Sequence, residues 1–360
     1  MRLHIIAPTY NPRVVAGAGL ALVKLTTRLF DRFPDAVIYL NRETAKAFPE
    51  WSGRIVTVSC GDMASPFRKA LTTLRLQLFG FPEFPRNGVC WFPFGPIMPL
   101  GFRGRGIATI HDTLELDQPS SVPLVERIFR AIVMPRTVQK TQVVTISRFS
   151  KQRLEHHYKI RPRVIEWGID PMRKGSDLRV PRQRYVFYPA NAYVHKNHRF
   201  LLDLWVKEPR LRGVALVLTA GGGTSPLDGA IKRARAAGVT VIVTGRVSND
   251  ELTGLYRNSD CTVLPTLYEG YGLPMRESLL CRCPVIANSE CEALHETVRE
   301  NYPFFVPLEP ELWVQAILSS RGSTRNSLPE FVVPRSWNDC AAEYTTIFQE
   351  ISNFQNTVPA

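Results

Sequence analysis

The 360-residue chain lacks the cysteine and carboxylate patterns that mark disulfide or metal proteins. Its seven cysteines are odd in number and include no Cys-x-x-Cys pair. The sequence therefore indicates neither a disulfide framework nor a zinc site, and we expect a reducing, cytoplasmic environment. No Asp-x-Asp motif occurs anywhere in the chain. A carboxylate clamp for a divalent metal is not indicated, so we expect no metal and no cofactor.

Long apolar runs and repeats are also absent. No stretch reaches the roughly 18 uninterrupted apolar residues of a membrane span, because the segment GVCWFPFGPIMPLGF is broken by Pro and Gly. The apolar run within MRLHIIAPTYNP is too short for a signal sequence. There is no internal repeat and no low-complexity tract. If the protein meets a membrane, we expect it to do so from the surface.

Acidic residues are scarce in one half of the chain. Residues 1–180 carry 27 Lys and Arg against 14 Asp and Glu, whereas residues 181–360 carry 18 of each. The first half should therefore face something anionic: a nucleic acid, a membrane surface or a phosphorylated substrate. A non-catalytic nucleic-acid binder is the alternative from another protein class. No module with interleaved aromatic and basic residues is visible, so we expect no nucleic-acid partner.

What is present favours two α/β domains. The length suits two domains, and 44% hydrophobic residues suffice for two cores. Short β-rich runs alternate with helical stretches, which predicts two Rossmann-like, doubly wound parallel sheets that face each other across a cleft. Strands are expected at 4–8, 36–40, 55–60, 89–94, 107–112, 143–147, 163–169, 185–189, 215–221, 239–245, 261–265, 284–288 and 304–307.

The domain boundary is expected in a polar segment. Residues 170–184, DPMRKGSDLRVPRQR, are charged and punctuated by Pro and Gly. We predict an N-terminal domain at 1–175 and a C-terminal domain at 176–335. A final helical segment at 336–360 is expected to return to the N-terminal domain.

The segment LYEGYGLPMRE sets two glutamates around a glycine turn. Glu269 follows a predicted strand, and Pro274 suits the first position of the next helix. The amides of residues 270–273 would form an anion site at the helix N-terminus. Glu277 is expected within the first turn, so both carboxylates can bind hydroxyl groups of a ligand that also carries phosphate, such as a nucleotide sugar. Alternatively, Glu269 is solvated and Glu277 only favours the positive helix end.

The wider segment 265–288, PTLYEGYGLPMRESLLCRCPVIAN, resembles the donor-binding signature of the family-4 glycosyltransferases, which are retaining enzymes of the GT-B fold. The hallmark of that family is E-x7-E with an E-G-[FY]-G-L-P core. The resemblance implies that Glu269 holds hexose hydroxyls and Glu277 holds the ribose. It extends over most of residues 105–350, while the first hundred residues match loosely.

Other segments follow the family order. Residues 185–205 resemble the opening of the donor domain, where Lys196 matches a lysine that neutralises the diphosphate. Residues 243–266 resemble the segment before the signature, with Gly245 and Val247 near the nucleotide base. Residues 163–170 resemble the interdomain strand, and SWNDCAAEYTTIF resembles the helix that returns to the first domain.

Two positions depart from the family. Relatives carry an arginine five positions before the lysine, and this chain has Asn191. Relatives have glycine where this chain has Arg282, which is either a substitute phosphate-binding cation or a solvent-facing cation at a helix end. The missing arginine puts donor choice and leaving-group stabilisation in question.

The first half offers two site motifs. Residues 17–19, Gly-Ala-Gly, are expected in a loop before a helix, where the backbone could approach a phosphate; ordinary turn chemistry is the alternative. His111 and Asp112 are expected at the carboxyl end of a strand, pointing into the predicted cleft. The family resemblance implies that His111 hydrogen-bonds the donor sugar, and Asp112 either assists or only orients the loop.

Residues 66–81, PFRKALTTLRLQLFGF, predict a basic amphipathic helix. Its apolar residues recur at helical spacing, and its cations lie elsewhere on the wheel. Such a helix can lie on an anionic membrane, or its apolar stripe can pack into the core while the cations are solvated. The apolar positions are Phe67, Ala70, Leu71, Leu74 and Leu78.

The resemblance implies a metal-independent, retaining hexosyltransferase. It would move a hexose from GDP-mannose or a UDP-hexose to a saccharide or polyprenyl diphosphate-linked acceptor, in polysaccharide, O-antigen or lipopolysaccharide assembly at the cytoplasmic membrane face. A nucleotide-sugar epimerase of similar architecture is the alternative enzyme. The catalytic residues implied are His111, Glu269 and Lys196; the donor-binding residues implied are Gly17, Ala18, Gly19, Asn191, Val247, Gly270, Tyr271, Gly272, Leu273 and Glu277.

Overall fold

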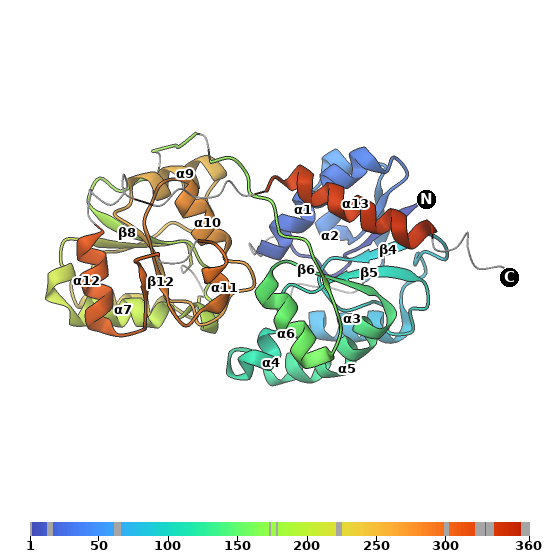
Figure 1. Ribbon diagram of the computed structural model, residues 1–360, viewed down its shortest axis with the longest axis horizontal. Coiled ribbons are helices and arrows are strands. Elements are labelled where there is room, and N and C mark those ends of the chain that lie inside the picture. Colours follow the sequence, from blue (N-terminus) through green and yellow to red (C-terminus); the bar gives the residue numbers. More distant parts are fainter. Residues whose placement is uncertain are drawn as a thin grey trace. The chain divides into compact units, whose positions relative to one another are not determined.

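The computed structural model describes residues 2–12, 17–60, 66–172, 174–177, 179–220, 225–298, 302–320, 328 and 335–353, without the side chains of 66–70. The chain divides into two compact units (Figure 1). The first unit contains residues 1–168 and 335–360, and the second contains residues 169–334. No described helix is both long enough and apolar enough to cross a membrane.

The first unit is built on a parallel sheet of seven strands in the order β3-β2-β1-β4-β5-β6-β7. The strands are β1 (Leu3–Ile6), β2 (Val37–Asn41), β3 (Ile55–Val58), β4 (Val89–Phe92), β5 (Arg105–Thr109), β6 (Gln142–Thr145) and β7 (Arg163–Val164). The helices are α1 (Gly17–Arg32), α2 (Arg42–Ala45), α3 (Pro66–Phe79), α4 (Leu114–Asp117), α5 (Leu124–Lys140), α6 (Arg148–Tyr158) and α13 (Trp337–Asn353), with single turns η1 (Pro49–Trp51) and η2 (Pro119–Ser121).

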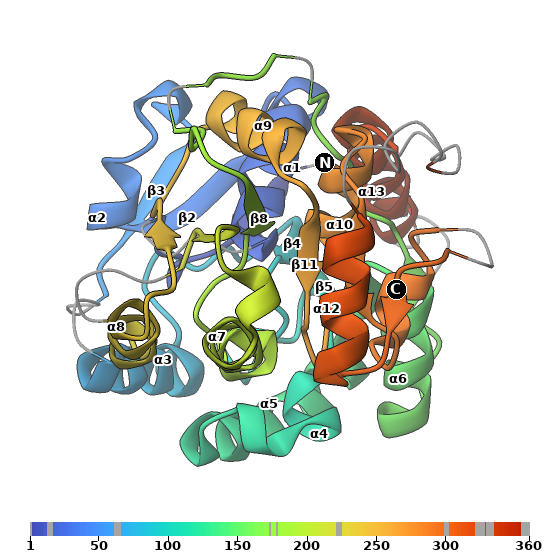
Figure 2. The same ribbon diagram turned by 90° about the vertical axis from the view of Figure 1, so that its left-hand side faces the viewer.

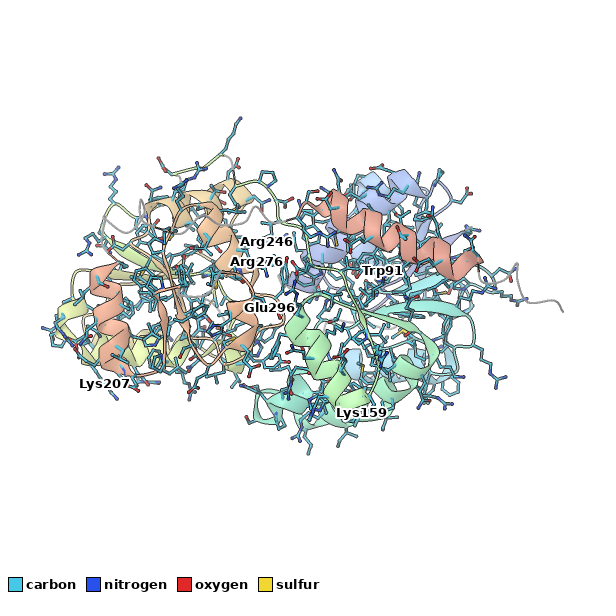
Figure 3. The ribbon with its side chains drawn as sticks, in the orientation of Figure 1. Trp91, Lys159, Lys207, Arg246, Arg276 and Glu296 are labelled. Atoms are coloured by element: carbon cyan, nitrogen blue, oxygen red, sulfur yellow. The ribbon has the colours of Figure 1, made fainter. Side chains whose placement is uncertain are left out.

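The last described helix, α13, closes one face of this first sheet. Its Tyr344 ring lies 5.2 Å from the ring of Trp91 on β4, and the Tyr344 hydroxyl is 2.7 Å from Thr109 Oγ1 on β5. Trp91 lies beneath α13 in Figure 3. Because these aromatic side chains are fully buried, residues far along the chain complete the core of the first unit.

The second unit has a parallel sheet of six strands in the order β10-β9-β8-β11-β12-β13. The strands are β8 (Tyr185–Tyr188), β9 (Ala215–Leu218), β10 (Val241–Val243), β11 (Thr262–Leu264), β12 (Val285–Asn288) and β13 (Phe305–Val306). The helices are α7 (His198–Lys207), α8 (Asp228–Ala236), α9 (Asn249–Asn258), α10 (Leu273–Leu280), α11 (Glu292–His295) and α12 (Pro310–Ser319), with single turns η3 (Val194–Lys196) and η4 (Pro209–Leu211).

Alternation along β8 explains why helices cover both faces of this second sheet. Val186 and Tyr188 join a core that includes residues of α7, α8 and α12, whereas Tyr185 and Phe187 pack with residues of α9. Strands buried on both faces read as continuous apolar runs, as YVFY does here. The predicted fold class, two parallel-sheet Rossmann-like α/β domains, is confirmed.

Each of the thirteen predicted strands overlaps an observed strand, although several predictions were too long. The strand expected at 163–169 forms only the two-residue β7. Beyond it, Gly168 packs so closely on the backbone of α13 that a Cβ at this position would lie 2.2 Å from Trp337 N. The chain leaves the sheet there because the next residue already belongs to the second unit.

Candidate active site

Two strands at the centre of the second sheet diverge in their connections. β8 lies between β9 and β11, so the chain leaves β8 toward one side of the sheet and leaves β11 toward the other. Such a switch point leaves a crevice at the carboxyl ends of the strands, where open α/β sheets bind ligands. Lys196, in η3, follows β8, and Glu269 follows β11.

Lys196 and Glu269 form an ion pair at this switch point. Lys196 Nζ lies 2.6 Å from Glu269 Oε1, and the two side chains are only 16% and 11% exposed. The interpretation of Glu269 as a solvated surface glutamate is therefore wrong. A close, largely buried pair is well ordered, and each partner compensates the charge of the other.

The backbone around Lys196 is tied to the loop that carries Glu269. Leu267 N donates to His195 O at 2.7 Å, and Asn197 Nδ2 donates to Pro265 O at 3.3 Å. On the other side, the Tyr188 hydroxyl donates to Lys196 O at 2.5 Å. Burial, and next the charge of Glu269, raise the pKa of Tyr188 well above its ordinary value, so this hydroxyl remains a donor. Both charged residues are thus held by rigid elements.

The glycine turn after Glu269 opens α10. Gly272 precedes the helix with φ +75°, and a Cβ there would lie 2.5 Å from Leu294 Cδ2, so only glycine fits. The helix begins at Leu273, so Pro274 is its second residue rather than the predicted first. Pro274 has no N–H, and Met275 N and Arg276 N both donate to Gly272 O, at 3.1 and 3.3 Å. The amides at this end of the helix that can receive an anion are therefore those of Gly272 and Leu273.

Glu277 lies further along α10 than predicted. It is the fifth residue of α10, just beyond the first turn, because the helix begins at Leu273. The Tyr256 hydroxyl on α9 donates to Glu277 Oε2 at 2.9 Å. Burial raises the pKa of Glu277 to about 7; the Tyr256 hydrogen bond opposes this rise, and the charge of Asp170 adds to it. Glu277 is therefore a half-buried, hydrogen-bonded carboxyl and not a solvated charge at a helix end.

Arg276 was not singled out by sequence reasoning. It is only 6% exposed, its guanidinium carbon lies 4.1 Å from the centre of the Tyr271 ring, and its Nε is 3.5 Å from Tyr271 O. No acidic side chain among the described residues forms an ion pair with it. Figure 3 shows Arg276 in the second unit. The sequence signal for Arg276 was its position as the one cation between Glu269 and Glu277. No sequence signal pointed to Tyr256, the partner of Glu277.

The remaining predicted donor-site residues lie around the same sheet. Asn191 is half-buried in the loop between β8 and η3. Gly245 has φ +65°, and Val247 packs against the cluster that contains Tyr256. Arg282 is exposed beyond the C-terminal end of α10 with φ +52°, the conformation that glycine favours at such an end. Arg282 is therefore a solvent-facing cation at the C-terminal end of α10, the end opposite the glycine turn.

The first unit has its own switch point, where β1 lies between β2 and β4. Residues 17–19 follow β1, but they form the first turn of α1 and not a loop before it. A Cβ at Gly19 would lie 3.1 Å from Tyr10 Cε2, so a side chain there would have to displace the Tyr10 ring slightly. Packing against Tyr10 thus favours glycine at position 19, in addition to the predicted phosphate role.

His111 lies two residues beyond β5. Its Nε2 is 2.8 Å from Pro93 O, directly after β4, and this contact requires the proton on Nε2. Nδ1 then carries a lone pair, and it has no hydrogen-bond partner among the described residues. Burial lowers the pKa of His111, while the charge of Asp112 opposes the shift. Asp112 Oδ1 accepts from Leu114 N at 3.1 Å and so orients the loop.

No group of three or more His, Cys, Asp or Glu side chains in the described part of the chain is arranged to hold a metal ion. The charged and hydrogen-bonding groups gathered at the second unit's candidate site are the Lys196–Glu269 pair, the amides at the start of α10 and Glu277. This combination suits a ligand with a charged group flanked by hydroxyls.

Sequence comparison shows what the second unit resembles. Residues 183–320 match the family model of the glycosyl transferases group 1. This match lies within the second unit, Ile169–Pro334. The chain is also 22% identical over 212 residues to the O-antigen chain mannosyltransferase RfbU of Salmonella typhimurium, a match that covers 58% of this chain and 59% of the relative. The chain thus spans less than two thirds of that relative.

Solved structures match the whole chain. Sucrose-phosphate synthase from Thermosynechococcus elongatus superposes with a TM-score of 0.73 at 15% identity, covering 98% of this chain and 99% of the other. Anabaena HepE in complex with UDP-glucose gives 0.67 at 14% identity, covering 99% and 100%. The two units therefore have the GT-B fold. The prediction of this fold is confirmed, and the match to the group 1 family model supports the predicted glycosyltransferase.

Proposed function

We propose that the protein is a retaining glycosyltransferase that moves a hexose from a nucleotide-diphosphate sugar to a saccharide acceptor. The observation that carries the proposal is the Lys196–Glu269 pair, 2.6 Å apart at the switch point of a sheet that belongs to the group 1 glycosyltransferase domain. A UDP-hexose or GDP-mannose is the proposed donor. HepE, a neighbour in fold, was solved with UDP-glucose, and RfbU is named a mannosyltransferase.

The two charges take separate parts of this donor. Lys196 and the amides of Gly272 and Leu273, at the N-terminus of α10, bind the diphosphate, so that they stabilise the charge which develops on its oxygens when the sugar departs. Glu269 accepts hydrogen bonds from hexose hydroxyls, and Glu277 does the same for the ribose. When the donor binds, Lys196 exchanges its ion pair with Glu269 for one with the phosphate. The Glu269 carboxylate can then accept hydrogen bonds from the sugar.

His111 contributes an acceptor to the same reaction. Its Nδ1 lone pair is fixed by the Nε2–Pro93 hydrogen bond and can accept a hydrogen bond from a hexose hydroxyl. Asn191, Val247 and residues 17–19 also contact the nucleotide-sugar donor. No step needs a metal, because cationic side chains and amides neutralise the leaving group.

Retention follows if the acceptor attacks from the face that the diphosphate leaves. The departing phosphate oxygen takes the proton of the acceptor hydroxyl, the new glycosidic bond forms at the anomeric carbon, and the bond to the diphosphate breaks. The acceptor is a saccharide or polyprenyl diphosphate-linked glycan in polysaccharide, O-antigen or lipopolysaccharide assembly, at the cytoplasmic face of a membrane. The basic first half supports an anionic acceptor of this kind.

A ligand panel tests the proposal before any acceptor is known. Purified protein is heated with UDP, GDP, ADP and their hexose conjugates, and a ligand that binds the native state raises the melting temperature. We expect one nucleotide series to stabilise the protein and Lys196→Ala to lose that stabilisation. Stabilisation by no nucleotide would contradict the proposal, and donor turnover without acceptor into an epimeric sugar would favour an epimerase.

A further inference from the structure

Exposed large apolar side chains are concentrated on three neighbouring helices of the first unit. Twelve such side chains are found among the described residues, and nine of them lie on α3, α4 and α5. Scattered single apolar residues need no explanation, but a concentration of this kind marks an interaction surface. The nine are Leu71, Leu74, Leu78, Phe79, Leu116, Leu124, Val125, Ile128 and Ile132.

The apolar stripe of α3 faces outward. Leu71, Leu74 and Leu78 are 59%, 48% and 57% exposed, although their spacing is that of one helical face. The opposite face, with Leu76 and Gln77, is buried. Core packing, one of the two interpretations of this helix, is therefore wrong for these three leucines. Phe67 and Ala70 lie outside the side chains that the structure describes.

A second outward stripe runs along α5. Leu124, Ile128 and Ile132 recur every four residues and are 64%, 53% and 60% exposed. Val133 and Met134 on the same helix are fully buried, so α5 packs on the sheet with its other face. Both helices thus expose apolar residues in addition to those they bury.

The two helices are neighbours. The short segment 97–100 bonds to both, because Ile97 N donates to Thr137 Oγ1 on α5 at 3.0 Å and Leu100 N donates to Gln77 O on α3 at 2.8 Å. Figures 1 and 2 both show α3 next to α5 within the first unit. We refer to the nine exposed apolar residues of α3, α4 and α5 as the α3–α5 face.

This face is flanked by positive charge. The sequences of α3, α4 and α5 contain seven Lys and Arg and three acidic residues, Glu115, Asp117 and Glu126. The Glu115 and Asp117 side chains are buried in ion pairs with Arg130 and Arg153. Glu126 forms an ion pair with Arg130 on the same helix, with 3.4 Å between Oε1 and Nε. Arg75, Arg136 and Lys140 are exposed. Apolar side chains flanked by cations match the boundary between acyl chains and anionic headgroups.

We infer that the α3–α5 face docks the protein onto an anionic lipid bilayer. The leucines and isoleucines enter the headgroup boundary, while the exposed cations contact lipid phosphates. A second copy of this chain fits less well, since a symmetric contact through the same face would oppose two cationic surfaces. The inference does not depend on the transfer reaction, although a lipid-linked acceptor would lie in the same membrane.

Vesicle co-sedimentation of the full-length protein tests the docking. The protein is mixed with vesicles of phosphatidylcholine alone or with 30% phosphatidylglycerol, at about 0.1 M salt, and the bound fraction is measured after centrifugation. We expect binding to the anionic vesicles and at least tenfold weaker binding to neutral ones. Equal binding to both, or no binding to anionic vesicles, overturns the inference.

Matched variants locate the contact. Ile132→Gln on α5 is compared with Val206→Gln on α7, another exposed apolar residue, which lies in the second unit. We expect Ile132→Gln to weaken binding about threefold to tenfold and Val206→Gln to leave it unchanged. Combining Ile132→Gln with Leu74→Gln and Leu78→Gln should abolish binding. A loss shared equally by the Val206 control would place the contact elsewhere and overturn the assignment of this face.

The charge contribution is tested separately. Arg136→Gln and Lys140→Gln, in the last turns of α5, should each weaken anionic-vesicle binding about fivefold and reduce its salt dependence. Because these positions are exposed, the variants should keep the wild-type melting temperature. Analytical ultracentrifugation tests whether a second copy of the chain occupies this face instead. If the protein forms a dimer that the leucine variants disrupt, and does not bind vesicles, the face serves self-association.

Discussion

Lys196 Nζ lies 2.6 Å from Glu269 Oε1, although 73 residues separate the two positions in the sequence. The pair lies where the connections of β8 and β11 diverge, and both side chains are largely buried. Each residue therefore holds the other in place before any ligand arrives. A phosphate that binds Lys196 competes directly with Glu269, so substitutions of the two residues should have different consequences.

Replacing Glu269 should separate nucleotide binding from transfer. Glu269→Gln removes the negative charge beside Lys196, so we expect UDP or GDP alone to bind as tightly as to the wild type, or more tightly. Transfer should fall by a factor of about 100 or more, because the amide no longer accepts charge-assisted hydrogen bonds from the hexose. Isothermal titration and a transfer assay with the donor found in the ligand panel measure the two effects. Wild-type transfer by the variant would contradict the role of Glu269.

Replacing Lys196 should act in the opposite direction. Lys196→Ala removes a charge-assisted contact to the diphosphate, and we expect nucleotide affinity to fall about tenfold to a hundredfold. Lys207→Ala is the matched control, since Lys207 is an exposed lysine at the end of α7 (Figure 3). The control should bind nucleotide normally in the same titration. Equal losses in both variants would indicate a general charge effect and not a site at Lys196.

Glu277 should make the stability of the protein depend on pH. Its pKa is raised from 4.5 to about 7, chiefly by burial, so the folded state binds this proton more tightly than the unfolded state does. The associated stability is fully present below about pH 4.5 and is lost as the pH rises through 7. Between pH 5 and pH 8 the wild type should lose roughly 1–3 kcal/mol that Glu277→Gln does not lose. Urea unfolding at both pH values measures this difference, and equal pH slopes would contradict it.

His111 should act as a neutral acceptor. Burial lowers its pKa below 6.5, so activity should not decline as the pH falls from 7.5 to 6.5. His111→Ala removes the Nδ1 acceptor, and we expect kcat to fall about 100-fold while nucleotide binding is unchanged. A pH–rate profile and titration of the variant with nucleotide check both statements. A loss of nucleotide affinity equal to the loss of kcat would mean that His111 only supports the fold.

Replacing Gly272 should destabilise the protein for a steric reason. Gly272 and Gly213 both have positive φ, but a Cβ at Gly272 would lie 2.5 Å from Leu294 Cδ2, whereas none of the described atoms lies within 4 Å of one at Gly213. Gly213→Ala should cost about 1 kcal/mol of unfolding free energy, from the backbone conformation alone. Gly272→Ala should cost roughly 2–3 kcal/mol, because the clash adds to that strain. Chemical unfolding of both variants measures the difference.

Local sequence determined much of this fold. Continuous apolar runs such as YVFY and ALVL are required when both faces of a strand are buried, and they place β8 and β9 directly. The glycine at position 272 and the proline at 274 fix the turn into α10 through their own backbone restrictions. These strands and this turn each depend on a few neighbouring residues, so they can be predicted from the sequence alone.

Only the tertiary structure decided which distant side chains meet and which way an amphipathic face turns. Lys196 forms an ion pair with Glu269, and Glu277 accepts a hydrogen bond from Tyr256. These pairs form because the order of the strands brings separate segments to one edge of a sheet. The stripe of α3 has the same spacing whether it faces a core or a partner, and the packing of Leu76 turns Leu74 outward. Periodicity specifies a face of a helix, whereas the burial of that face depends on every element packed around it.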